Sequence, residues 1–197
     1  MKQILLVAVS IIMTLCLSAQ KIRYGISAGI NTGYILLKDG LDESGGNATG
    51  FQGGAMLQIP INKNIGIMPQ LLYVRRQGTV YNFRFDQRNI ELPVSIVYTH
   101  NNFYIGGGAG IAYGLSANSI MKDGGDYSKV DLYQEGNDFL LLKRTTFTLN
   151  TIMGYRFPGG FSMNAGFSPV LGNIRDDEAD NSIRSKMFSF SLGYMFP

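Results

Sequence analysis

Large hydrophobic residues recur at every second position in eight separate stretches of this chain. The clearest stretch is at the C-terminus, where Phe188, Phe190, Leu192, Tyr194 and Phe196 alternate with serine, glycine and other uncharged residues. A period of two indicates a β-strand whose two faces differ in polarity. An apolar face opposite a face of small polar residues is typical of a membrane β-barrel wall, which has lipid on one side and a filled interior on the other.

All eight stretches reach the roughly 9–11 residues that a tilted membrane strand requires. They cover residues 22–34, 51–61, 65–76, 83–98, 103–115, 143–157, 161–171 and 187–196. The connections alternate between short turns (62–64, 99–102 and 158–160) and longer polar segments, including expected loops over 38–50 and 116–140. Outer-membrane barrels have short periplasmic turns, longer external loops and an even number of strands. The sequence therefore predicts an eight-stranded antiparallel up-and-down transmembrane barrel with a filled lumen, periplasmic termini and long loops outside.

Aromatic residues flank the predicted periplasmic turns. We expect them to form a girdle at the level of the lipid headgroups, as aromatic rings do in membrane barrels. The girdle residues are Tyr98, Phe103, Phe157, Phe161, Tyr194 and Phe196, and Phe51, Tyr113 and Phe147 are the candidates for its outer counterpart. Four prolines fall inside predicted strands; strand ends or bulges account for Pro60 and Pro169, whereas Pro69 and Pro93 lie further inside. Because each removes a ladder hydrogen bond, local β-bulges are expected at Pro69 and Pro93.

Residues 1–19 have the pattern of a secretory signal peptide. Lys2 precedes an apolar run of about 14 residues, too short to span a bilayer as a helix, and small residues lead to expected cleavage after Ala19. Residues 20–197 then form one barrel domain. Cleavage would remove Cys16, the only cysteine, so a disulfide or a cysteine nucleophile is not expected.

The composition favours a membrane wall over a soluble barrel. Charged residues make up 16% of the chain, against about 25% in typical soluble domains, and they cluster between the apolar stretches. A secreted carrier of the lipocalin kind, which we keep as an alternative, would need its apolar faces inside and charge on its outer surface. The net charge of +3 is too small to indicate a nucleic-acid partner.

Three stretches make the chain resemble the PorT-like outer-membrane β-barrel proteins. They are MPQLLYVRRQG at 68–78, NIELPV at 89–94 and FYIGGGAG at 103–110. Two departures are Gln70, where an acidic residue is expected, and Pro197 after Phe196. The resemblance implies a small barrel in the outer membrane of Gram-negative bacteria and a link to a protein-secretion apparatus. The expected partners are outer-membrane lipid and lipopolysaccharide, the barrel-assembly machinery through the C-terminal strand, and secretion-apparatus proteins.

Four charged residues point into the predicted lumen by their position along the strands: Arg23, Arg76, Glu91 and Arg156. An eight-stranded barrel is just wide enough to be filled by its own side chains. A carboxylate there needs a charged partner, because an unpaired buried ion costs several kcal/mol. We therefore interpret the four residues as a structural plug, with a gated narrow small-solute channel as the alternative. Glycines on the inner face of 103–115, including Gly110 and Gly114, are expected to make room for bulky groups across the lumen.

No catalytic, cofactor or metal site is expected. The only histidine, His100, lies in a predicted periplasmic turn, away from the outer rim where a hydrolase of this architecture would meet its substrate. One histidine also cannot anchor a zinc triad. The acidic residues of the expected external loops lack the spacing of a calcium loop; they are Asp39, Asp42, Glu43, Asp123, Asp126, Asp176, Asp177, Glu178 and Asp180. The sequence thus predicts a non-enzymatic barrel with a structural or protein-interaction role in the cell envelope.

Overall fold

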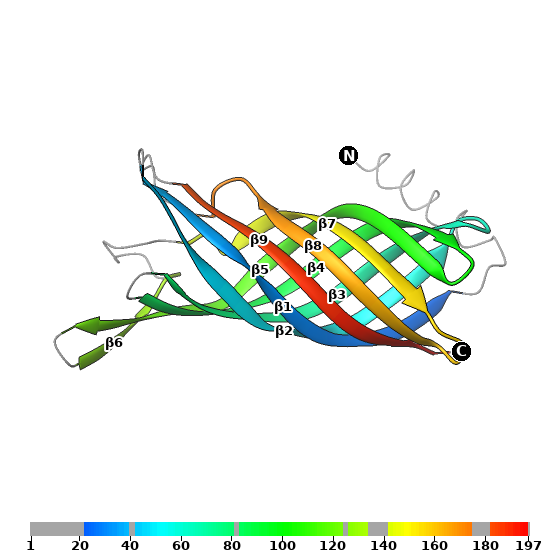
Figure 1. The fold of residues 1–197 in the computed structure, drawn as a ribbon, viewed down its shortest axis with the longest axis horizontal. Coiled ribbons are helices and arrows are strands. Elements are labelled where there is room, and N and C mark those ends of the chain that lie inside the picture. Colours follow the sequence, from blue (N-terminus) through cyan, green and yellow to red (C-terminus); the bar gives the residue numbers. More distant parts are fainter. Residues whose placement is uncertain are drawn as a thin grey trace, which may run out of the picture.

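Closure of a single antiparallel sheet organises this chain. The computed structural model describes residues 22–39, 42–80, 83–123, 126–133, 142–174 and 182–196. These residues form nine strands: β1 (Arg23–Asp39), β2 (Asp42–Pro60), β3 (Ile65–Val80), β4 (Phe83–His100), β5 (Phe103–Asp123), β6 (Asp126–Asp131), β7 (Thr145–Arg156), β8 (Phe161–Leu171) and β9 (Ser182–Met195). All except β6 join edge to edge, and β4 pairs with β5 to close the barrel (Figure 1). The predicted eight-stranded barrel is confirmed. Within the described ranges, no helix is long and apolar enough to cross a membrane.

The cross-strand register shows how steeply the strands are tilted. One circuit of paired residues starts on β3 at Ile67, passes through Ile96, Gly107, Thr151, Phe167, Phe188, Thr32 and Thr49, and returns to β3 at Gln77. The return point lies ten residues beyond the start, from position 67 to position 77, and this shift is the shear of the barrel. Strands in closed barrels are inclined by about 35–45°, and an eight-stranded barrel has an interior that side chains can fill.

Alternation along each strand separates an apolar outer face from a polar inner face. On β7, Phe147 and Leu149 are 58% and 47% exposed, whereas the intervening Thr148 is 4% exposed and Asn150 is 8% exposed. The same alternation runs along the C-terminal strand β9, where Ser185, Met187, Ser191 and Met195 are buried. A soluble protein would bury the apolar set. The observed arrangement suits a wall surrounded by hydrocarbon, and it contradicts the carrier alternative, which needs the apolar faces inside.

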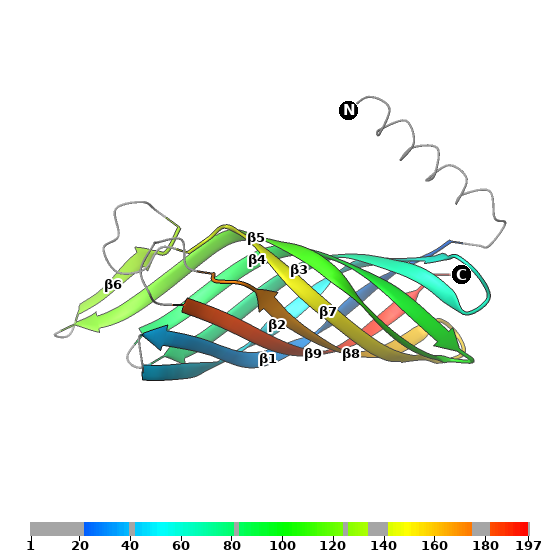
Figure 2. The same ribbon diagram turned by 90° about the horizontal axis from the view of Figure 1, so that it is seen from above.

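The strands extend further than the alternating stretches predicted. β1 and β2 remain paired up to Asp39 and Asp42, within the expected loop at 38–50. β5 continues to Asp123, and β6 pairs back onto it inside the expected loop at 116–140, so that this hairpin projects beyond the barrel end (Figures 1 and 2). The prediction of unstructured loops over these residues was wrong. Antiparallel pairing continues there, but neither face meets lipid, so the sequence carries no period-two signal.

The expected bulges at the two strand prolines are also absent. The β3–β4 register is unchanged across Pro69 and Pro93, since Pro69 pairs with Val94 and Leu72 pairs with Glu91. Each proline removes one hydrogen-bond donor without inserting a residue. The register shift lies instead between β4 and β5, beside Arg88 and Asn89, and it leaves one extra residue on β5.

A charge on the outer face is expected to destabilise the barrel in proportion to its depth in the membrane. Val94 lies midway along the apolar part of β4, and Thr49 lies on the outer face of β2 beyond Phe51. We predict that Val94→Arg lowers the free energy of unfolding from lipid vesicles by about 2–4 kcal/mol, whereas Thr49→Arg lowers it by at most about 1 kcal/mol. Urea titrations followed by the gel shift between heated and unheated samples would measure both. Equal losses in the two variants would contradict the membrane placement.

Candidate functional site in the barrel lumen

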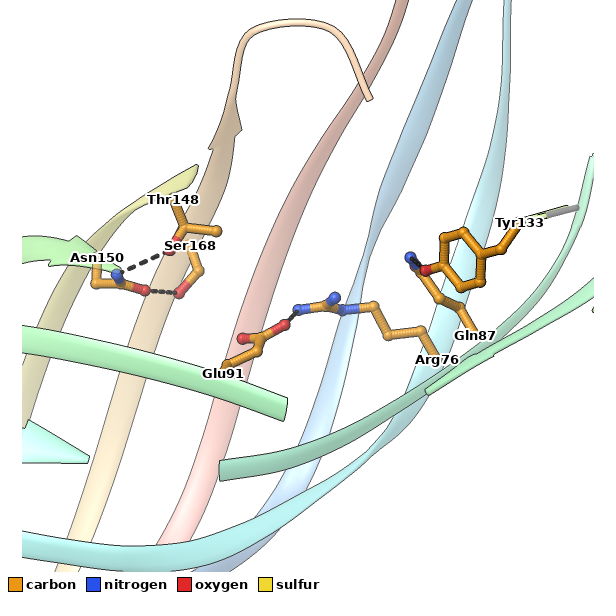
Figure 3. A network of polar contacts seen from close by, with 7 residues as sticks. All are labelled: Arg76, Gln87, Glu91, Tyr133, Thr148, Asn150 and Ser168. Carbon is orange, nitrogen blue, oxygen red and sulfur yellow. Dashed lines mark hydrogen bonds and ion pairs between the residues drawn. The ribbon is translucent and has the colours of Figure 1, made fainter. Parts of the chain in front are cut away.

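A buried ion pair links two neighbouring strands inside the barrel. Nη2 of Arg76 on β3 donates to Oε1 of Glu91 on β4 at 2.6 Å, and the two side chains are only 8% and 10% exposed (Figure 3). Both residues face inward because they occupy the polar face of their strands. Each ion compensates the charge of the other, which is the condition for keeping two charges in a lumen of this size.

The mouth of the barrel on the side of the β5–β6 hairpin is occupied by Tyr133, which follows β6. Gln87 on β4 donates from Nε2 to the phenol oxygen of Tyr133 at 3.1 Å (Figure 3). The ring also lies so close to Gly114 that a Cβ there would collide with the phenol oxygen. Arg144 lies over the ring, 5.2 Å from its centroid, and burial raises the pKa of the phenol, which therefore stays protonated.

Apolar packing and backbone hydrogen bonds hold Tyr133 at the mouth. Tyr133, Ala117 and Leu132 form a buried cluster, against which Leu142 packs. The amide of Leu132 donates to the carbonyl of Ala117 at 2.8 Å, and that of Leu142 donates to the carbonyl of Leu132 at 2.9 Å. Leu132 and Tyr133 are thus fixed at this opening, beyond the Arg76–Glu91 pair.

A second closure lies in the opposite half of the lumen, on the side of the β4–β5 turn. Met68, Val97 and Tyr104 form a cluster in which each residue is at most 2% exposed. Arg156 donates from Nη2 to Oε1 of Gln58 at 2.5 Å, and its guanidinium lies 5.6 Å from the centroid of the Tyr104 ring. Side chains of opposite walls therefore meet across the lumen and block it.

A small polar cavity of about 50 Å³ remains between the two closures. Its lining includes Asn31, Gln52, Gln70, Ser95, Asn150 and Ser189, together with the Arg76–Glu91 pair. Asn150 donates to Thr148 Oγ1 at 3.0 Å and accepts from Ser168 at 2.8 Å (Figure 3). Asn31 is 3% exposed, and neither atom of its amide has a partner in the described part of the chain. The volume suffices for a few water molecules, which we expect to satisfy these atoms.

Comparison with known proteins agrees with this architecture. A family model described as "Outer membrane protein beta-barrel domain" matches residues 4–196. The chain belongs to this family. Two solved structures share its fold: Ail, the attachment invasion locus protein of Yersinia pestis (TM-score 0.53, 15% identity, 90% of this chain and 100% of that chain), and Neisserial surface protein A (TM-score 0.51, 14% identity, 90% and 100%). Curated protein sequences give no match.

This outer-membrane barrel separates the four charged residues of the predicted plug into two groups. Arg76 and Glu91 lie together. Arg156 lies at the end that holds the β4–β5 turn, and Arg23 is exposed there, opposite Gln58 in the register. Neither Tyr133 nor the contact between Arg156 and Gln58 was predicted from the sequence. The glycines on the inner face of β5 were the one available signal, because Gly114 makes the space that the Tyr133 ring occupies.

The aromatic residues assigned to the periplasmic girdle face outward at one end of the barrel. Tyr98, Phe103, Phe157 and Phe161 are 40–62% exposed. Ring contacts connect several members: Phe161 with Tyr194 at 5.0 Å, Tyr194 with Phe196 at 5.3 Å, and Phe196 with Tyr24 at 5.3 Å. These contacts join β1, β8 and β9 where the first and last strands meet.

The remaining candidate residues form no reactive constellation in the described structure. His100 is exposed at the end of β4, paired with Phe103. The described ranges contain no group of three potential metal ligands. The acidic side chains at 39, 42, 43, 123 and 126, the residues 176–180 and the signal peptide fall outside what the structure describes.

Replacing Glu91 is expected to leave an uncompensated charge inside the barrel. We predict that Glu91→Gln lowers the free energy of unfolding by about 3–5 kcal/mol, because the Arg76 guanidinium stays buried. Asp86→Asn is the matched control, since Asp86 forms an ion pair with Arg75 at 2.7 Å on the outer face, where solvent screens it. Urea unfolding in detergent micelles would measure both variants. A Glu91→Gln barrel as stable as Asp86→Asn would contradict a stabilising role for the buried pair.

Proposed function

We propose that this chain is a non-enzymatic outer-membrane barrel with a structural or protein-interaction role in the cell envelope. The observation that carries the proposal is the double closure of the lumen, by Tyr133 and the Arg76–Glu91 pair at one end and by the Tyr104 cluster at the other. A cavity of about 50 Å³ between them is too small for a solute path. The surfaces left for function are the two ends and the outer wall.

We further propose a topology with the termini in the periplasm and the β5–β6 hairpin outside the cell. In this proposal, residues 1–19 direct export and residues 20–197 form the mature barrel. The short β4–β5 and β7–β8 turns lie at the same end as the start of β1 and the end of β9, which supports their assignment to the periplasm. The aromatic end of β9 is the segment that we propose contacts the barrel-assembly machinery.

The projecting hairpin is the surface that we propose for contacts with other envelope components. Its strands extend beyond the closed barrel, as Figure 2 shows, and they present paired backbone beyond the barrel wall. The PorT-like resemblance supports proteins of a secretion apparatus as partners. Ail has also been crystallised with the heparin analogue sucrose octasulfate, which supports a polysaccharide ligand as a second candidate for this end.

Single cysteines would test the proposed topology. Asn47 on β2 and Lys63 in the β2–β3 turn are both exposed, at opposite ends of the barrel. We predict that a membrane-impermeant maleimide labels Asn47→Cys in intact cells but labels Lys63→Cys only after the outer membrane is opened. The reverse pattern would invert the proposed orientation.

Bilayer recordings would separate the proposed closed barrel from the channel alternative. We predict no steady conductance above that of protein-free lipid, because both ends of the lumen are blocked by packed side chains. The heat-dependent gel shift of protein recovered from the same vesicles would show that folded barrels were present. Steady, ion-selective openings of the wild-type protein would overturn the closed-barrel proposal.

A further inference from the structure

Outward-facing basic residues follow directly after the apolar belt at one end of the barrel. They are Arg75 on β3, two residues after Tyr73; Arg88 on β4, two residues before Ile90; and Lys186 and Arg184 on β9, two and four residues before Phe188. Arg75, Arg88 and Lys186 are each the first outward charge reached when their strand leaves the apolar belt, and Arg184 is the next outward residue after Lys186. We call these four residues the basic collar. The collar lies at the end of the barrel opposite the aromatic girdle, on the side of the β5–β6 hairpin.

The two halves of the collar differ in how their charge is compensated. Arg75 donates from Nε and Nη2 to the two carboxylate oxygens of Asp86 at 3.0 and 2.7 Å, and Arg88 approaches the same carboxylate at 3.7 Å. Hydrogen bonding from Arg75 lowers the pKa of Asp86, so this carboxylate stays ionised. Arg184 and Lys186 are both exposed, and no carboxylate of the described residues forms an ion pair with either. Among the residues that the structure describes, the β9 half therefore presents two exposed positive charges without an ion-pair partner.

The surroundings of the β9 half suit an amphiphilic anion. Lys186 is the cross-strand partner of Tyr34, whose side chain is 41% exposed and brings a hydroxyl to the same face. On the membrane side, Phe188 is 57% exposed and lies against Phe167, with ring centroids 4.7 Å apart. Two residues along a strand span roughly 6.5 Å, so the two cations can contact one or two phosphates whose acyl chains lie on the aromatic rings.

We propose that Arg184 and Lys186 form a binding site for the phosphates of a phosphorylated glycolipid in the outer leaflet. This inference rests on the proposed orientation, because the collar must lie on the external side to meet that lipid. The glycolipid carries its phosphates at the boundary between acyl chains and sugar, where the collar follows the apolar belt. Basic residues at such a boundary are the usual means by which membrane proteins hold anionic headgroups.

Lipid binding by the full-length folded protein would test the site. The protein in neutral detergent micelles would be titrated with three lipids: diphosphorylated lipid A, the same lipid after removal of its phosphates, and phosphatidylglycerol. Native mass spectrometry would count the lipid molecules bound to each protein. Each basic side chain near an anionic headgroup strengthens binding about fivefold. We expect Lys186→Gln to weaken binding of the phosphorylated lipid about fivefold and Arg184→Gln/Lys186→Gln about thirty-fold. Lys63→Gln, the same change in an exposed turn at the opposite end, should leave it unchanged.

Several results would overturn the site. These are wild-type affinity in the double variant, an equal loss in Lys63→Gln, or equal binding of the phosphorylated and dephosphorylated lipids. Phosphatidylglycerol binding as tightly as lipid A would show a general anion surface and contradict recognition of the glycolipid. The gel shift of unheated samples shows whether each variant is folded. If the double variant does not fold, the lipid affinity of the single variant Lys186→Gln decides whether the site exists. Failure of the orientation would appear separately, as labelling of Lys63→Cys in intact cells.

Discussion

Hydrocarbon offers no partner for backbone amides and carbonyls, so every one of them in the wall must be bonded to a neighbouring strand. This constraint requires the sheet to close, which it does through the β1–β9 and β4–β5 pairs. Closure with eight strands and a shift of ten residues fixes the circumference, and the circumference fixes the width of the lumen. The character of the interior follows from that width, because side chains from opposite walls meet across it.

A lumen of this width tolerates polar groups only when they are compensated. The Arg76–Glu91 pair, the Asn150–Ser168 hydrogen bond and the contact between Arg156 and Gln58 all satisfy this requirement. Small inner residues provide the necessary space: a Cβ at Gly108 would collide with the backbone carbonyl of Val94 on the next strand. The interior is therefore used for stability, and this directs attention to the two ends and to the outer wall.

The fold could be predicted from the sequence only where contact with lipid requires apolar and polar residues to alternate along a strand. Between Phe188 and Tyr194 on β9 the period of two correctly identified the inward and outward residues, because one face must be apolar. β6 and Tyr133 lie beyond the membrane, where no such rule acts, and the hairpin was taken for a loop. The alternation along the strands also placed Arg156 and Arg76 correctly on the inner face, but it did not predict how far along the barrel axis each residue lies. Depth depends on the register, and the register depends on turn lengths and on the shift beside Asn89, which the pattern of residues does not encode.

The same distinction applies to the basic collar. Its four residues all face outward, yet their chemistry depends on what lies across the strand from each. Asp86 pairs with Arg75 and is approached by Arg88, so the protein itself compensates part of the charge in that half of the collar. In the described structure, Lys186 pairs across the strands with Tyr34, and Arg184 pairs with Leu36. Positive charge beside exposed aromatic rings is stabilised when an amphiphile supplies both acyl chains and a phosphate. This combination of two exposed cations and neighbouring exposed rings is why we propose that the β9 half of the collar binds such a ligand.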